Sequence, residues 1–153
     1  HLAFSTLHTN DPPAAITRLQ DMGCEPYLFS SVLNGVLAQR LVRRICEVCR
    51  APKVADSAEL AALGVAATGA EELFHGKGCD ECRGTGYRGR TGIYELIVVD
   101  DALRRLIHDR ASEQALRAAA AAAGMTSLRR DGARWLADGT TSLAELVRVS
   151  REA

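Results

Sequence analysis

Several features that would point to a function class are scarce in this sequence of 153 residues. With 19 basic and 19 acidic residues it carries no net charge, so no overall attraction to nucleic acid or anionic lipid follows. Aromatic residues make up 5% of the chain, too few for the stacking platform of a single-strand binder. The apolar runs are far shorter than the ~20 residues that span a bilayer. These absences favour a globular domain that binds no nucleic acid.

Lysine is also rare, and this bears on nucleotide binding. Lys53 and Lys77 are the two lysines, and neither stands in a GxxxxGK[ST] motif, so the sequence contains no P-loop. The apolar run that ends in Asp100 and Asp101 imitates the strand-end carboxylate that holds Mg²⁺ in P-loop ATPases. Without a P-loop beside it, we interpret this pair as acids at the N-terminus of a helix, stabilised by the helix dipole.

Four of the five cysteines form two CxxC pairs: Cys46 with Cys49, and Cys79 with Cys82. Four thiolates complete a tetrahedral Zn²⁺ shell with no open position, which is the composition of a structural site. The 29 residues between the pairs exceed the roughly 15–20 of a compact zinc ribbon, so we expect the metal to staple the base of a small subdomain. Thiols unrelated to metal and redox thiols are the alternatives. Cys24 is predicted to be a small buried hydrophobe.

The first part of the chain has the pattern of an α/β domain. A strand is predicted over residues 1–7, followed by a loop. Asp11 suits the N-cap of a helix that begins at Pro12, and Gly23 suits its end. A second helix is predicted over residues 26–33. Alternating side chains then predict a strand over residues 36–45, which leads into the first CxxC pair.

The remainder is predicted to contain one more strand and several helices. Between the CxxC pairs, Asp56 begins a short capped helix that ends near Gly64. The nearly continuous apolar run from Ile93 to Val99 predicts a strand covered on both faces. Four short helices follow, and their starts are marked by Asp100, Ser112, Ser127 and Ser142, the last of which forms a capping box with Glu145.

Polar side chains follow the first predicted strand. Loops beyond the carboxyl ends of strands in an open α/β sheet are where ligands bind. Thr6, His8, Thr9 and Asn10 are therefore placed to touch a phosphate or a catalytic water, and a neutral histidine there can donate to an oxyanion. The alternative is a capping or packing role, which is common for a single histidine in a turn.

Arginines concentrate on both sides of the predicted metal module. A solvated rim with local acids, contacts between subunits and contacts with phosphate are all compatible with this pattern. The residues are Arg40, Arg43, Arg44, Arg88 and Arg90.

Several stretches, in order along the whole chain, carry a resemblance to a known family. They are His1-Leu-Ala-Phe-Ser-Thr-Leu-His8-Thr-Asn-Asp11, Ala15-Ile-Thr-Arg18-Leu19, Gly35-Val-Leu-Ala-Gln39-Arg40-Leu-Val42, the two CxxC pairs, Gly89-Arg90-Thr-Gly92-Ile-Tyr-Glu95-Leu96, and Gly124-Met125 with Leu128. Together they resemble the secretion traffic ATPases. The resemblance is strongest to the type II secretion ATPases (general secretory pathway protein E), and the type IV pilus assembly ATPases come next.

The resemblance implies an α/β fold that is the C-terminal part of a RecA-like P-loop ATPase domain. Residues 1–45 and 88–99 would belong to that domain, residues 46–87 would be an inserted four-Cys zinc module, and residues 100–153 a C-terminal all-helical subdomain. His1 and His8 match the family's His box, which lies near the nucleotide phosphates, with Thr6 and Thr9 as neighbours. The ligands of the metal module would be Cys46, Cys49, Cys79 and Cys82.

The resemblance also implies a homo-hexameric motor that hydrolyses ATP with Mg²⁺ in the cytoplasm, peripherally associated with the inner membrane, where platform proteins of the secretion system are its partners. In this family the P-loop and the Walker B acid precede the His box. We therefore expect the chain to be the C-terminal piece of a longer protein and inactive alone. A type IV pilus assembly ATPase and a non-enzymatic, zinc-stabilised interaction module are the alternatives.

Overall fold

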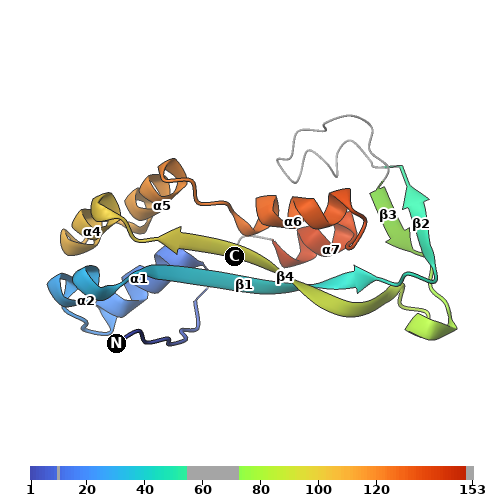
Figure 1. Cartoon of the computed structure of the whole chain (residues 1–153), viewed down its shortest axis with the longest axis horizontal. Coiled ribbons are helices and arrows are strands. Elements are labelled where there is room, and N and C mark those ends of the chain that lie inside the picture. Colours follow the sequence, from blue (N-terminus) through green and yellow to red (C-terminus); the bar gives the residue numbers. More distant parts are fainter. Residues whose placement is uncertain (10, 55–72, 151–153) are drawn as a thin grey trace. The chain divides into compact units, whose positions relative to one another are not determined.

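The computed structural model describes residues 1–9, 11–54 and 73–150 (Figure 1). Contacts divide the chain into two compact units. Unit 1 consists of His1–Ala38 with Glu95–Thr126, and unit 2 of the described residues within Gln39–Tyr94 and Ser127–Ala153. Strands β1 (Gly35–Ile45) and β4 (Tyr87–Val98) form a two-stranded sheet, and each contributes residues to both units. Each unit has a hydrophobic core of its own.

Unit 1 begins with two helices that confirm the predictions from caps and prolines. Helix α1 spans Pro12–Asp21, and the Asp11 side chain caps it by accepting a 2.9 Å hydrogen bond from the Ala14 N–H. Gly23 follows with a φ of +87°, the left-handed conformation that glycine adopts without strain. Helix α2 spans Pro26–Val32, one residue shorter than predicted.

Two further helices complete unit 1. Helix α4 spans Asp101–His108 and is capped by Asp100, which accepts from the Leu103 N–H. This confirms that Asp100 and Asp101 are acids at a helix N-terminus. Helix α5 spans Glu113–Ala122 and is capped by Ser112. The core between these helices and β4 contains Ile16, Ile97, Val99, Leu103, Ile107, Leu116 and Ala120.

Unit 2 combines a small sheet with two helices. Strand β2 (Arg50–Lys53) pairs antiparallel with β3 (Leu73–Gly76) in a register that places Arg50 opposite Gly76 and Lys53 opposite Leu73. Helices α6 (Leu128–Ala137) and α7 (Leu143–Val149) are capped by Ser127 and Ser142, as predicted. The core contains Val42, Leu73, Ile93, Leu136, Leu143 and Leu146.

The strand predicted over residues 1–7 is wrong: residues 1–9 have no regular secondary structure. A strand needs a neighbour that satisfies its backbone N–H and C=O groups, and the described residues form two sheets, neither of which includes this segment. The apolar pattern that suggested a strand is largely solvent-exposed, since 73% of Leu2 and 91% of Phe4 is accessible.

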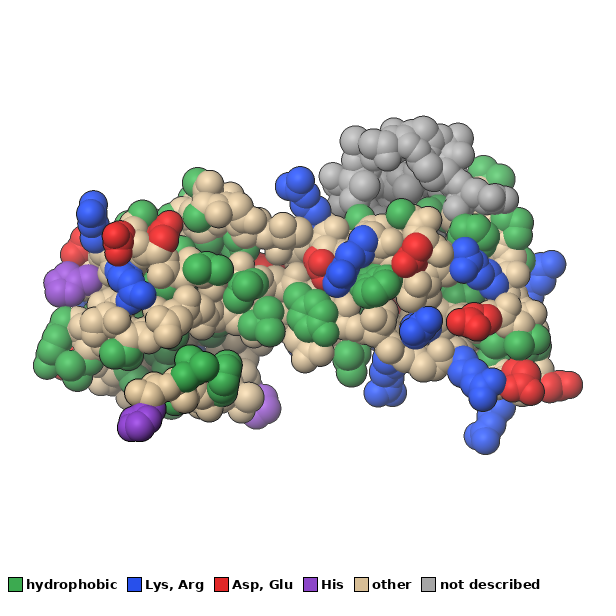
Figure 2. Space-filling model, in the orientation of Figure 1, with side chains coloured by type: hydrophobic (Ala, Val, Ile, Leu, Met, Phe, Trp, Pro, Cys, Tyr) green, Lys and Arg blue, Asp and Glu red, His purple; other side chains and the backbone are tan. Residues whose placement is uncertain are grey.

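Strand β4 also differs from its prediction. It begins at Tyr87 instead of Ile93, so the Arg-Gly-Arg segment is part of the strand. Its burial alternates, with Ile93 and Ile97 buried and Leu96 and Val98 exposed. The expectation of a strand covered on both faces is therefore wrong, because side chains of one face remain in solvent. Hydrophobic side chains are visible on the surface in the space-filling view (Figure 2).

The helix predicted from Asp56 to Gly64 lies outside the described residues. Cys24 is exposed, so the prediction that it is buried is wrong. Strands β2 and β3 were not predicted, because four-residue strands with polar residues give no clear alternation. No helix in the described part of the chain is long and apolar enough to cross a membrane.

Candidate metal centre and histidine pocket

The four cysteines of the CxxC pairs lie on two similar tight turns. In the first turn, between β1 and β2, the Cys49 N–H donates to the Cys46 carbonyl at 3.2 Å. In the second, a short 3₁₀ helix (η1, Asp80–Cys82), the Cys82 N–H donates to the Cys79 carbonyl at 3.2 Å. The turns are joined by backbone hydrogen bonds from Lys77 to Cys49 and from Cys46 to Gly86.

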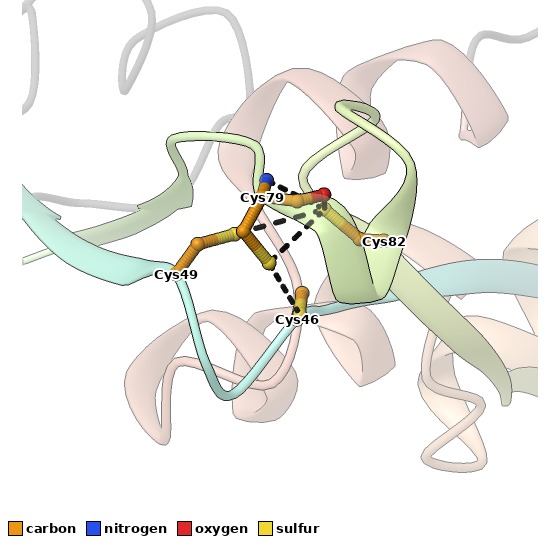
Figure 3. A group of neighbouring side chains, drawn as sticks. All are labelled: Cys46, Cys49, Cys79 and Cys82. Carbon is orange, nitrogen blue, oxygen red and sulfur yellow. Dashed lines mark hydrogen bonds between the residues drawn. The ribbon is translucent and has the colours of Figure 1, made fainter.

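The four side chains point toward one another (Figure 3). All four Sγ atoms lie within 4.8 Å of each other, and three pairs are separated by 3.7 Å (Cys79–Cys82), 3.8 Å (Cys46–Cys79) and 3.9 Å (Cys49–Cys82). These distances are too long for a disulfide, which needs about 2.05 Å. A tetrahedral zinc ion with Zn–S bonds of about 2.3 Å would separate its sulfurs by about 3.8 Å. The sulfur positions therefore fit a tetrahedral four-thiolate metal ion.

The backbone around Cys82 stabilises a thiolate. Burial alone raises the pKa of Cys82, but the N–H groups of Cys79 and Gly86 donate to its Sγ at 3.2 Å each and, with the neighbouring thiols, lower that pKa to about 6. The Cys82 N–H lowers the pKa of Cys79, but burial and three neighbouring thiols outweigh it and raise that pKa to about 11. Burial is also the main cause that raises the pKa of Cys49. The protons of Cys79 and Cys49 would be displaced when a metal ion binds.

Glycines allow the two turns to approach each other. A Cβ built on Gly76 would lie 2.0 Å from the Gly86 carbonyl oxygen, and one built on Gly86 would lie 2.5 Å from the Gly76 carbonyl oxygen. Gly86 also has a φ of +78°. Side chains at these positions would push the second turn away from β3. Gly76, before the second CxxC pair, and Gly86, after it, therefore allow the geometry of the four-Cys site.

The metal centre is attached to the helices of unit 2. The Arg50 guanidinium stacks on the Phe74 ring at 3.9 Å and donates to the Asp138 carbonyl at 3.0 Å. The Ile45 N–H, next to Cys46, donates to the Thr140 carbonyl at 2.8 Å. The loop between α6 and α7 therefore supports both β2 and the first CxxC turn.

A buried carboxylate links the same helices to β1. Glu145 is fully buried at its side chain and accepts hydrogen bonds from the Arg43 and Arg148 guanidinium groups, at 2.7 Å each, and from the Arg43 N–H at 3.0 Å. Burial opposes ionisation, but these donors outweigh it and lower the pKa of Glu145 to about 2. The predicted capping box is half right: Ser142 accepts from the Glu145 N–H, whereas the carboxylate contacts the two arginines.

Arg43 is one of the five arginines that flank the Cys turns, and it pairs with Glu145. Arg88 lies 2.7 Å from Glu81, and Arg44 lies 3.8 Å from Glu47. Basic and acidic side chains are accordingly interspersed around the Cys turns (Figure 2). Arg43, Arg44 and Arg88 therefore each pair with an acidic side chain that lies nearby in the fold.

The predicted phosphate-contacting residues are partly brought together in unit 1. His8 and Thr9 line an open pocket of about 300 Å³ with residues of α1 and α5: Ala14, Thr17, Arg18, Asp21 and Glu113. The exposed residues His1 and Thr6 are not among the residues that line it. Asn10 lies outside the described residues.

The wall of this pocket that α1 forms has a signal in the sequence, beyond the residues predicted to contact phosphate. Ala14, Thr17, Arg18 and Asp21 lie at helical spacings of three and four, on one face of α1, opposite the buried Ile16. Glu113 had no such signal, because its position depends on how α5 packs against α1.

Comparisons with known proteins show relatives over nearly the whole chain. The family model described as "Type II/IV secretion system protein" matches residues 1–148. The type II secretion system protein E of Pseudomonas aeruginosa is 53% identical over 152 residues, and the type II secretion system ATPase E of Vibrio cholerae is 49% identical over 152 residues. Each match covers 99% of this chain and 30% of the relative.

A pilus protein is more distant but similar over the same region. The type IV pilus assembly ATPase PilB of Thermus thermophilus is 45% identical over 149 residues, which is 96% of this chain and 17% of that protein. The chain thus spans about 30% of the length of the type II relatives named above. The two type II relatives named above are more similar to this chain than the pilus protein, and the family match confirms the resemblance identified from sequence. The chain belongs to the type II/IV secretion system protein family.

Proposed function

We propose that this chain is part of an ATPase that powers type II protein secretion. The observation that carries the proposal is the match over 99% of the chain, at about half identity, to proteins named for type II secretion. One of these relatives is named an ATPase. ATP and Mg²⁺ would be bound by the complete protein, because phosphoryl transfer needs a phosphate-binding loop and the present sequence has none.

Within that protein, residues 1–45 and 88–99 would be the C-terminal part of a RecA-like domain, and residues 100–153 a helical subdomain. The complete protein would act as a homo-hexamer at the cytoplasmic face of the inner membrane, in contact with platform proteins of the secretion system. The mixed strands and helices of the structure and the family match support an α/β assignment.

The four cysteines would hold a structural Zn²⁺ ion. Their sulfur separations suit tetrahedral coordination, and two N–H groups already donate to Cys82 Sγ. With four protein ligands no position is left for substrate, so the ion would cross-link the two turns and take no part in hydrolysis. The module of residues 46–87 would then be a rigid accessory of the motor.

His8 would contact the nucleotide phosphates, with Thr9 beside it and His1 and Thr6 as less direct members of the same segment. The pocket supports this role for His8, because it groups an imidazole with hydroxyl and guanidinium side chains, all of which can donate to phosphate oxygens.

The test is ATP turnover by the full-length protein. We expect His8→Ala to lower kcat about tenfold or more, as removal of a transition-state donor does, with the thermal unfolding temperature unchanged. His108→Ala is the matched control, since this exposed histidine in the last turn of α4 is outside the pocket lining. Normal turnover by His8→Ala would remove the phosphate role.

Pilus assembly is the second candidate. It is favoured by the 45% identity to a type IV pilus assembly ATPase over nearly the whole chain, and it would use the same ATPase chemistry with a different filament.

A further inference from the structure

Arg117, in the middle of α5, lies among three carboxylates of unit 1. Its Nη2 is 2.6 Å from Asp11 Oδ2 and 3.1 Å from Glu113 Oε1, and its Nη1 is 4.0 Å from Glu95 Oε1. The Glu95 side chain is 7% exposed and that of Asp11 23%. One guanidinium therefore connects the segment before α1, the first turn of α5 and a buried position of β4.

Asp11 is the member of this cluster that reaches the histidine segment. Its Oδ1 caps α1 through the Ala14 N–H, its Oδ2 contacts Arg117, and its backbone oxygen accepts a 3.4 Å hydrogen bond from the Thr9 hydroxyl. A change in the position of Asp11 would therefore move both the start of α1 and Thr9, which is adjacent to His8.

The pocket is built from the elements that Arg117 joins. His8 and Thr9 come from the opening segment, Thr17 and Arg18 from α1, and Glu113 from α5. Arg117 lies one helical turn after Glu113 and contacts it directly. Because 42% of its side chain is exposed, the ion pairs add little to stability. Their geometrical effect is to fix α5 against the start of α1.

We propose that Arg117 is a positioning residue for nucleotide hydrolysis, which holds His8 and Thr9 in place through Asp11. This inference rests on the proposed function of His8. Arg117 itself does not line the pocket, so it acts through Asp11 and not by contact with the nucleotide. The planar guanidinium fixes the directions of the two Nη2 N–H bonds that reach Asp11 and Glu113, whereas a lysine ammonium rotates freely.

The experiment measures Mg²⁺-dependent ATP hydrolysis by the full-length protein. Asp11→Asn retains an N-cap acceptor but removes the charge that pairs with Arg117, and Arg117→Gln removes the other partner. We expect each variant to lower kcat about tenfold, since small misplacements of catalytic groups reduce rates strongly, while KM for ATP and the unfolding temperature change little. The kcat of the double variant should be no lower than that of either single variant. The kcat of Arg117→Lys should lie between those of wild type and Arg117→Gln.

Arg104→Gln is the matched control, since Arg104 is an arginine of α4 that donates to the Ser30 carbonyl and is outside the pocket; it should retain kcat. The inference is overturned if His8→Ala loses turnover while Asp11→Asn keeps it, or if the Asp11→Asn and Arg117→Gln losses multiply in the double variant. It is also overturned if the loss of kcat follows the unfolding temperature across all variants. If His8→Ala and Asp11→Asn are both silent, the proposed role of His8 is wrong, and the inference falls with it.

Discussion

Glu145 illustrates how a single side chain can be misjudged from its neighbours in sequence. Ser142 and Glu145 have the spacing of a capping box, and half of that box forms. The carboxylate instead neutralises Arg43, more than one hundred residues away in sequence, and Arg43 stacks on Tyr87 at 4.1 Å. Local propensity fixes where α7 begins, but the partner of a buried charge is decided by tertiary packing, which sequence spacing does not contain.

The low pKa of Glu145 predicts a pH-dependent contribution to stability. The pKa falls from 4.5 to about 2 on folding, so the folded state gains from the ionised form above pH 4.5. This gain is lost as the pH falls from about 4.5 toward 2. Glu145→Gln should therefore lower the free energy of unfolding by about 3 kcal/mol at pH 7, and the difference from wild type should shrink below pH 4.5.

Thermal unfolding followed by circular dichroism at matched zinc concentrations checks this. Comparing Glu145→Gln with wild type at each pH cancels the effect of acid on the cysteine thiolates, because that effect is the same in both proteins. Glu25→Gln is the control, since Glu25 is exposed and lies 4.0 Å from Arg110; it should change stability little at any pH. A wild-type advantage that persists unchanged to pH 3 would contradict the assignment.

At the scale of elements, helices were predicted more accurately than strands. Asp11, Asp100, Ser112, Ser127 and Ser142 each cap the helix that was predicted from them, because a cap is a local interaction between residues two or three positions apart. Strands depend on distant partners. Residues 1–7 have strand-like composition without a described partner, whereas Arg50–Lys53 has little strand character and pairs directly with β3.

The four-Cys site was predictable for the same reason as the caps. Each CxxC turn is local, and the spacing within each pair already places two thiols side by side for a possible metal ion. Strands β2 and β3, which adjoin these turns, have little stability on their own. Their ladder has four residue pairs, and an isolated two-stranded sheet is marginally stable in water.

Removal of metal should therefore affect one part of the chain selectively. Structural zinc contributes roughly 10–16 kcal/mol in small modules. We expect a chelator to abolish amide protection in β2, β3 and both CxxC turns, while α1, α2, α4 and α5 keep theirs, because the core of those helices contains no residue of the metal module. Hydrogen exchange measured by mass spectrometry reports both regions.

Cys79→Ser should reproduce the effect of the chelator, and Cys24→Ser, at an exposed cysteine outside the site, should not. Well under one zinc ion per chain in a reduced sample would count against the centre, as would unchanged protection after zinc is removed.

At the scale of the whole molecule, the division into two units does not follow the order of segments along the chain. The four helices after residue 100 follow one another in the chain, and contacts group α4 and α5 with unit 1 and α6 and α7 with unit 2. Leu103 and Leu116 pack with Ile16, while Leu136 and Leu146 pack with Val42. Amphipathic helices show in sequence which face is apolar, but not which of two cores will accept it.

The 153-residue chain, taken alone, lacks a part that ATP hydrolysis needs. It contributes a histidine pocket and a four-Cys cluster that could hold a metal ion, but no GxxxxGK[ST] segment. Phosphoryl transfer depends on a loop that cradles the phosphates and on a Mg²⁺ ion placed beside them. We expect the purified chain to release no phosphate from ATP under conditions in which the full-length protein turns over. Phosphate release that co-elutes with the chain through gel filtration, and that His8→Ala abolishes, would show that the pocket binds and hydrolyses nucleotide without a P-loop.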